Sequence, residues 1–166
     1  MKFLPAKLLY LPALLMLIIL TGCEQSGQPG VSSGDRVVLG LHEHAKVFGN
    51  YTIHVNALTT DQLPSDVART YRIQRSKSRV MLNVVIMKNE SGVDKPMTGT
   101  VTALTRNLAS QIKNLEIREI IEQDAIYYIG TVSVANAETL IFDIDVTPAN
   151  ETTSFLLNYK QQFFTE

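Results

Sequence analysis

The stretch Tyr51-Thr52-Ile53-His54-Val55-Asn56-Ala57 alternates between apolar and polar side chains at every step. Successive side chains of an extended strand point to opposite faces, so a period of two predicts a β-strand with one buried and one polar face. The buried face would carry Tyr51, Ile53, Val55 and Ala57, and the polar face would carry Thr52, His54 and Asn56. A strand of this kind needs a second apolar layer to pack against.

The same period recurs along the rest of the chain. Strands are expected at residues 36–41, 51–57, 80–87, 97–104, 115–121, 125–134 and 140–147, and in a last segment that carries Phe155, Leu157, Tyr159 and Phe163. Turn-length connections between most of them imply antiparallel pairing. The exception is a short helix at residues 63–71, because Pro64 suits a first helical position and Asp66 suits the positive end of a helix dipole.

These elements predict an all-β fold for residues 36–166. We expect an immunoglobulin-like antiparallel β-sandwich of about seven strands, with one short helix after the first long strand. The alternative is an α+β fold. The cysteine and tryptophan signature of true immunoglobulin domains is absent, because the chain has no Trp and a single Cys.

The N-terminus has the pattern of a lipoprotein signal. Lys2 and Lys7 precede an apolar run of about 13 residues. This run is too short for a spanning helix, and Pro12 interrupts it. It ends in Leu20-Thr21-Gly22-Cys23, which a lipoprotein signal peptidase would recognise. The alternative is an N-terminal transmembrane anchor.

Cleavage of a signal peptide at residues 1–22 would leave Cys23 as an N-terminus that carries fatty acyl chains such as palmitate. The Gly- and Ser-rich residues 23–35 would then be a flexible tether. In lipoproteins, an Asp directly after the acylated cysteine favours retention in the inner membrane. Residue 24 is Glu instead, so the predicted location is the periplasmic side of the outer membrane. With Cys23 acylated, no thiol remains for a disulfide, a nucleophile or a metal site.

The charge balance argues against a nucleic-acid partner. The chain has 15 basic and 16 acidic residues, and residues 1–22 contain two lysines and no acid, so the mature chain carries −3. A mildly acidic domain has no overall attraction for a polyanion.

Several segments together resemble one known family. They begin with residues 51–58, Leu63-Pro64, Val67-Ala68, Ile73 and Arg75-Ser76-Lys77, and continue with Asn107-Leu108, Glu119-Ile120, residues 125–129 and Phe142-Asp143-Ile144. Over residues 46–165 the chain resembles the domain-of-unknown-function family numbered 4426, which consists of small exported bacterial proteins. The resemblance implies a single exported β-rich domain and supplies no catalytic residues.

A basic segment stands out within this region. Five cations fall within residues 69–79, and no acid occurs between Asp66 and Glu90. This pattern indicates a basic patch for lipid headgroups, glycan phosphates or an acidic protein. The alternative is a solvated helix and loop whose cations pair with acids elsewhere. The five residues are Arg69, Arg72, Arg75, Lys77 and Arg79.

Three further groups of residues involve histidines or aspartates. His54 and Asn56 would project together from one strand face, as a polar ligand site or a solvated face. His42, His44 and His54 could hold copper or zinc, since such sites use His at short spacings. Asp143 and Asp145 share a strand face, where paired carboxylates could divide acid and base roles or lie in solvent.

The sequence therefore favours a membrane-anchored periplasmic lipoprotein without catalysis, whose small β-sandwich binds an envelope protein or an anionic envelope component. The bilayer would be contacted through acylated Cys23, and no cofactor is expected. The main alternative is a copper or zinc module using His42, His44 and His54. A hydrolase would need a pocket at Asp143 or His54, and the sequence has no Gly-x-Ser-x-Gly, His-Glu-x-x-His or phosphate-loop motif. The candidate contact residues are His54, Asn56, Arg72, Arg75 and Lys77.

Overall fold

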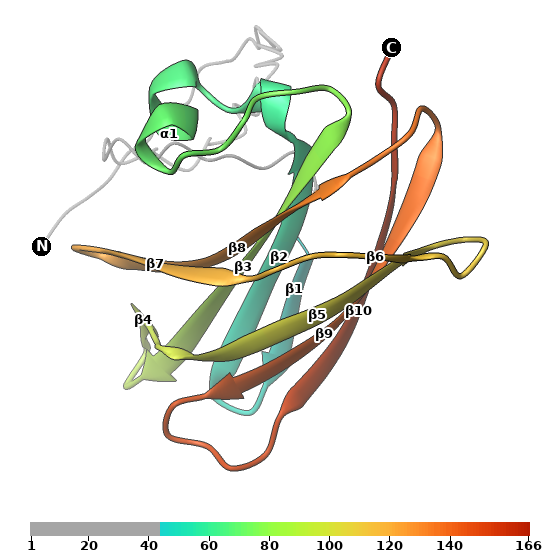
Figure 1. Cartoon of the computed structure of the whole chain (residues 1–166). Coiled ribbons are helices and arrows are strands. Elements are labelled where there is room, and N and C mark those ends of the chain that lie inside the picture. The colour runs from blue at the N-terminus through green and yellow to red at the C-terminus, as the bar shows by residue number, and fades with distance from the viewer. Residues whose placement is uncertain (1–43) are drawn as a thin grey trace, which may run out of the picture. The chain divides into compact units, whose positions relative to one another are not determined.

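Two antiparallel β-sheets pack face to face in the computed structural model, which describes residues 44–166 (Figure 1). The predicted signal peptide, Cys23, the tether, the strand expected at residues 36–41 and His42 all lie outside the described residues. Within the described part, no helix is long and apolar enough to span a bilayer.

The larger sheet has six strands in the order β1-β2-β3-β8-β7, with β4 pairing to β3 as a short hairpin. Its register places Ile53 opposite Ile86 and His54 opposite Val85, so the alternation of β2 separates the core from the outer face. The strands are β1 His44–Phe48, β2 Tyr51–Thr59, β3 Arg79–Glu90, β4 Val93–Pro96, β7 Arg118–Glu122 and β8 Ala125–Ser133.

The smaller sheet has four strands in the order β10-β9-β5-β6. These strands are β5 Gly99–Asn107, β6 Ile112–Lys113, β9 Glu138–Pro148 and β10 Phe155–Phe163. Apolar side chains from both sheets fill the space between them, and Phe142 at its centre is fully buried. Burial of this apolar surface is the main term that holds the two layers together.

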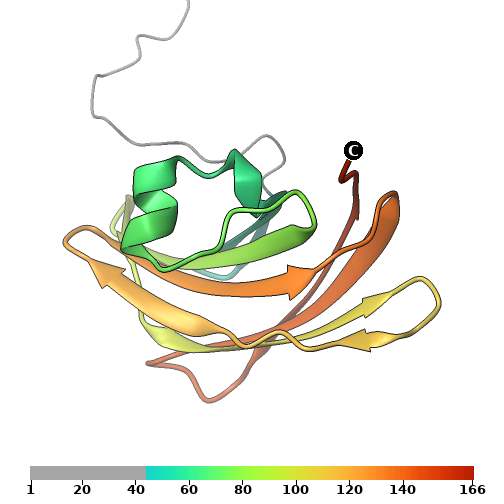
Figure 2. The same cartoon turned by 45° about the horizontal axis from the view of Figure 1, so that its top comes forward.

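The predicted antiparallel sandwich is confirmed, but the strand number is wrong, because ten strands are present rather than about seven. The sequence pattern missed β1, β4 and β6. The first two are largely exposed on both faces, and β6 has only two residues, so none shows a period of two. Residues 115–117, predicted as strand, have none, because the chain there leaves the smaller sheet after β6 and enters the larger one at β7 (Figure 2).

The predicted helix is present as α1, Ser65–Thr70, after a 3₁₀ turn at Thr60–Gln62. It covers the outer face of the larger sheet (Figure 2). Leu63, Ala68 and Ile73 pack there against Met81 of β3 and Ile129 of β8. This small second core fixes the loop that leads from α1 into β3.

Tyr128 makes a polar connection across the sandwich. Its hydroxyl accepts a hydrogen bond from the Gly99 backbone N–H at 2.7 Å and donates one to Glu119 at 2.6 Å. Burial and the bond to Glu119 raise the pKa of Tyr128 above its ordinary value, so the hydroxyl stays protonated. Tyr128 of the larger sheet is thereby hydrogen-bonded to Gly99, the first residue of β5 in the smaller sheet.

Candidate functional site

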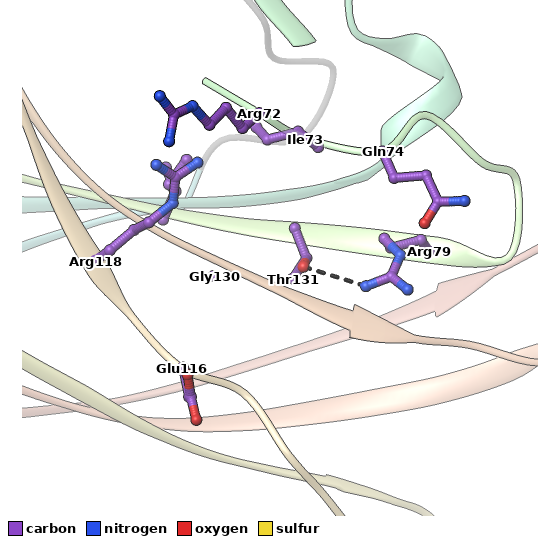
Figure 3. Close-up of a pocket in the computed structure, with 9 residues that line it drawn as sticks. Arg72, Ile73, Gln74, Arg79, Glu116, Arg118, Gly130 and Thr131 are labelled. Carbon is purple, nitrogen blue, oxygen red and sulfur yellow. Dashed lines mark hydrogen bonds between the residues drawn. The ribbon is translucent and has the colours of Figure 1, made fainter. Parts of the chain in front are cut away.

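A pocket of about 230 Å³ lies between the loop that follows α1 and the edge of the larger sheet. We refer to it as the arginine pocket (Figure 3). It forms where β8 runs past the beginning of β7, since their pairing starts at Arg118 and Ile129. Its lining residues are Arg72, Ile73, Gln74, Arg79, Glu116, Arg118, Ile129, Gly130 and Thr131.

Arg72 reaches the pocket from the C-terminal cap of α1. The Ile73 N–H donates to the Ala68 carbonyl at 2.7 Å, and the Arg72 N–H donates to the Arg69 carbonyl at 3.1 Å. These two bonds form a Schellman motif, in which the residue after the cap is left-handed and usually glycine. Arg72 occupies that position with φ 53°, and buried Ile73 fixes the loop behind it.

Arg118 enters from the first position of β7. Its guanidinium donates a hydrogen bond to the Tyr71 carbonyl at the end of α1, where the helix dipole favours a cation. The Tyr71 hydroxyl donates in turn to Glu122, and this bond, with burial, raises the pKa of Tyr71 to about 12. The strand and the helix end are thus held together at the wall of the pocket.

Arg79 approaches from the other side, as the first residue of β3. Its Nη1 donates a long hydrogen bond of 3.4 Å to the Thr131 hydroxyl of β8. Figure 3 shows the guanidinium groups of Arg72 and Arg118 on one side and the Arg79–Thr131 pair on the other. Cationic donors therefore flank the pocket from two directions.

Gly130 sets how closely the crossing segment, residues 114–117, approaches the sheet. A Cβ atom at this position would lie 2.7 Å from Leu115 Cδ1 and 2.8 Å from the Glu116 carbonyl oxygen. Only glycine lets the crossing segment lie directly against β8. The lower wall of the pocket, which includes Glu116, depends on this contact.

The lining is strongly cationic. It contains three arginines and one acid, Glu116, so its formal net charge is +2. Within residues 44–166, the ion pairs involve Lys88 and Lys95 with Glu90, Arg106 with Asp143, and Lys113 with Glu138, and none includes an arginine of the pocket. Among the described residues, therefore, no ion pair with a carboxylate neutralises the remaining net charge of the pocket.

The predicted basic segment is only partly assembled into this site. Arg72 and Arg79 line the pocket, whereas Arg75 is turned away and donates to the Asp61 carbonyl at 2.6 Å. Lys77 is exposed on the turn before β3 and lies outside the lining. Arg118 was missed, because only the pairing of β7 with β8 brings it beside residues so far away in sequence.

The two described members of the predicted histidine cluster, His44 and His54, lie on opposite faces of the larger sheet. His54 pairs with Ala45, so it lies on the outer face, and neighbouring His44 lies on the opposite face. His44 instead contacts the Tyr159 ring edge-on, with centroids 4.9 Å apart. Among the described residues, no three His, Cys, Asp or Glu side chains are grouped to hold a metal ion.

The remaining candidates do not meet in a cavity. His54 and Asn56 are half-buried on the outer face of β2 and are not among the lining residues of the arginine pocket. Asp143 accepts hydrogen bonds from Arg106 Nε at 3.2 Å and from Asn158 at 2.5 Å. Asp145 accepts one from Ser154 at 3.3 Å. Both aspartates are thus used in contacts across the outer face of the smaller sheet.

Comparisons with known proteins agree with this architecture. The model of the family described as a domain of unknown function, DUF4426, matches residues 45–166. A crystal structure of a DUF4426 family protein from Pseudomonas aeruginosa is similar at 28% identity and a TM-score of 0.65, over 75% of this chain and 96% of that one. No curated protein matches the sequence.

Two structures of FetP from uropathogenic Escherichia coli share the fold at low identity. FetP isolated after expression in the periplasm has 10% identity and a TM-score of 0.52, over 75% of this chain and 98% of that one. A copper-bound FetP variant has 11% identity and a TM-score of 0.53, over 74% of this chain and 95% of that one.

Proposed function

Because the chain belongs to the DUF4426 family, a domain of unknown function, we propose a role from its geometry: it is a non-catalytic, lipid-anchored periplasmic protein that binds an anionic component of the cell envelope in the arginine pocket. The observation that carries this proposal is the lining of three arginines whose charge no carboxylate of residues 44–166 neutralises by an ion pair. Arg72 and Arg118 are exposed and Arg79 is half-buried, so the guanidinium groups are accessible and can donate charge-assisted hydrogen bonds to an anionic ligand.

The proposed location rests on the N-terminal sequence. The apolar run and Leu20-Thr21-Gly22-Cys23 support acylation at Cys23. Acyl chains would hold the body near the membrane surface, on the periplasmic side and preferably at the outer membrane. FetP, which shares the fold, was expressed in the periplasm, and this is compatible with an exported domain.

Substitution of Cys23 by serine should abolish acylation and keep the protein out of the outer membrane. Serine has no thiol to accept the diacylglycerol, so we expect an unprocessed precursor with no acyl label. The measurement is metabolic labelling with a fatty-acid analogue, followed by separation of inner and outer membranes. A Cys23→Ser protein that is cleaved and membrane-bound like the wild type would contradict lipid anchoring.

The metal alternative receives less support from the described chain. A FetP variant binds copper in its crystal structure, but FetP shares only 11% identity with this chain. Here His44 and His54 lie on opposite faces of the sheet, so the two imidazoles cannot meet at one ion without rearrangement.

Binding in cells can be tested by cross-linking from inside the pocket. A photoreactive residue in place of exposed Gln74 should label an anionic envelope component, identified by mass spectrometry. The double change Arg72→Gln and Arg79→Gln should abolish this adduct, because it removes two of the three cations of the pocket.

The chain offers a control with the same change in charge. Arg75→Gln with Lys77→Gln removes two cations from the same loop but from outside the pocket, so the adduct should persist. Loss of labelling in both double variants would mean that general surface charge is sufficient. A labelled protein in place of an anionic component would overturn the proposal.

A further inference from the structure

We propose that the arginine pocket recognises a phosphate monoester in its doubly charged form. This inference rests on the proposed function and names the chemical class of its ligand. The supporting observations are the charge of the lining, the directions from which its donors approach, the backbone conformation of Arg72 and the volume of the pocket.

The charge of the lining matches a dianion. Three arginines and Glu116 give a net charge of +2. A phosphate monoester carries about −1.5 to −2 at neutral pH, since its second pKa is about 6. A carboxylate or a phosphodiester carries a single negative charge and would leave one cation of the pocket uncompensated.

The donors suit a tetrahedral group better than a planar one. Arg72 and Arg118 lie on one side of the pocket, and Arg79 with the Thr131 hydroxyl lies on the other (Figure 3). A phosphate presents three terminal oxygens in different directions, and guanidinium forks bind such oxygens in pairs. A carboxylate presents only two oxygens, both in one plane, so it offers no third terminal oxygen to a donor that lies out of that plane.

Arg72 occupies a backbone position that does not favour arginine. At φ 53° in the cap of α1, glycine would avoid the steric penalty of a Cβ atom. A left-handed residue that is not glycine and lines a pocket is a recognised sign of function, because the surrounding structure must hold it there. Here buried Ile73 anchors the loop at the point where Arg72 lines the pocket.

The volume indicates that the phosphate is part of a larger molecule. At about 230 Å³ the pocket could hold roughly seven water molecules, which exceeds a single phosphate group. Part of the esterified alcohol would therefore enter as well. A monoester phosphate could belong to a membrane-bound headgroup or to a soluble phosphorylated alcohol, and both share the chemistry that the pocket recognises.

The test uses the full acylated protein in detergent micelles and isothermal titration calorimetry, at about pH 7.5, where the second phosphate proton is mostly dissociated. Glycerol 3-phosphate serves as the monoester, glycerophosphoglycerol as the diester and acetate as the carboxylate. Glycerol 3-phosphate should bind saturably and at least about tenfold more tightly than the other two. Titration of glycerol 3-phosphate into the protein reconstituted in phosphatidylcholine vesicles that contain phosphatidic acid or phosphatidylglycerol then shows whether a membrane-bound monoester competes for the pocket.

Arg72→Gly separates binding from folding. It removes one guanidinium but gives the cap the residue that its conformation favours. We expect the Kd for glycerol 3-phosphate to rise about tenfold while the melting temperature stays the same or rises. Arg75→Gly removes the same charge from outside the pocket and should leave the Kd unchanged.

The outcomes distinguish the two levels of the proposal. If the diester or acetate bound as tightly as the monoester, the phosphate assignment would be wrong and anion binding would stand. If none of the three anions bound, both proposals would be overturned. An unchanged Kd for Arg72→Gly would also overturn the assignment, because the pocket would then not be the binding site.

Discussion

Replacing Glu138 by glutamine is expected to lower the free energy of unfolding at neutral pH by about 3 kcal/mol. Glu138 begins β9, and its carboxylate accepts hydrogen bonds at both oxygens. Oε2 accepts hydrogen bonds from Lys113 Nζ at 2.6 Å and from the Ala135 N–H at 2.8 Å, and Oε1 accepts one from Asn107 Nδ2 at 2.9 Å. The Glu138 and Lys113 side chains are only 13% and 22% exposed, so solvent cannot replace these partners easily.

Glutamine has nearly the same shape but cannot satisfy this arrangement. Its NH₂ group must face either Asn107 or the Lys113 and Ala135 donors, and each of these positions needs an acceptor. The Lys113 ammonium would also lose its counter-charge while remaining mostly buried. Removing one partner from a buried ion pair costs more than the pair contributed, since the remaining charge is left uncompensated.

The destabilisation should depend on pH in a defined direction. Burial opposes ionisation of Glu138, but hydrogen bonds from Lys113, Ala135 and Asn107 outweigh it and hold its pKa below the ordinary value of 4.5. A carboxyl whose pKa is lowered by folding contributes its full stabilisation above the unfolded pKa. That contribution is lost as the pH falls through the lowered pKa of the folded state. The difference in the free energy of unfolding between the wild type and Glu138→Gln should therefore become small only below pH 4.5.

Glu90→Gln provides the matched control. Glu90 also has a lowered pKa, because Lys95 and Lys88 donate to its carboxylate. These contacts lie in the exposed β3–β4 hairpin, where water and salt screen ion pairs, so little stability should be lost. Urea denaturation of both variants across the acid range measures the difference. An equal loss of unfolding free energy in the two variants would contradict this account. So would a loss for Glu138→Gln that does not vary with pH.

The parts of the fold that the sequence predicted are those with an apolar and a polar face. β2 and β9 alternate cleanly because one face of each meets the core and the other meets the outer surface. α1 was predictable from Pro64 and Asp66 at its start. β1 was not, because its residues are mostly exposed and it is held by pairing with β2.

The candidate site was predictable only in part, for a physical reason. The basic segment is a local signal, and it contains Arg72 and Arg79. Which of its five cations share a pocket depends on the helix cap and on the register of β7 with β8, and these are tertiary properties. The one local sign of special geometry is glycine at position 130, within a strand where glycine is unfavourable.

Gly130→Ala should both destabilise the protein, by about 2 kcal/mol, and weaken binding in the arginine pocket. The added Cβ would lie 2.8 Å from the Glu116 carbonyl oxygen and 2.7 Å from Leu115 Cδ1. A backbone oxygen cannot rotate away as a flexible side chain can, so the crossing segment must shift away from β8. The shift would move Glu116 and the adjoining start of β7, from which Arg118 enters the pocket.

Gly99→Ala distinguishes this local effect from general destabilisation. A Cβ at Gly99 would lie 2.6 Å from the Thr147 carbonyl oxygen and 2.9 Å from Ile86 Cδ1, so the clash is as severe. Gly99 begins β5 in the other sheet and is not part of the arginine pocket. Urea denaturation should therefore show a comparable loss for both variants, whereas calorimetry with glycerol 3-phosphate should show weaker binding only for Gly130→Ala. If the two variants bound equally well at equal loss of stability, the crossing segment would not shape the pocket, and its close contact with β8 would serve packing alone.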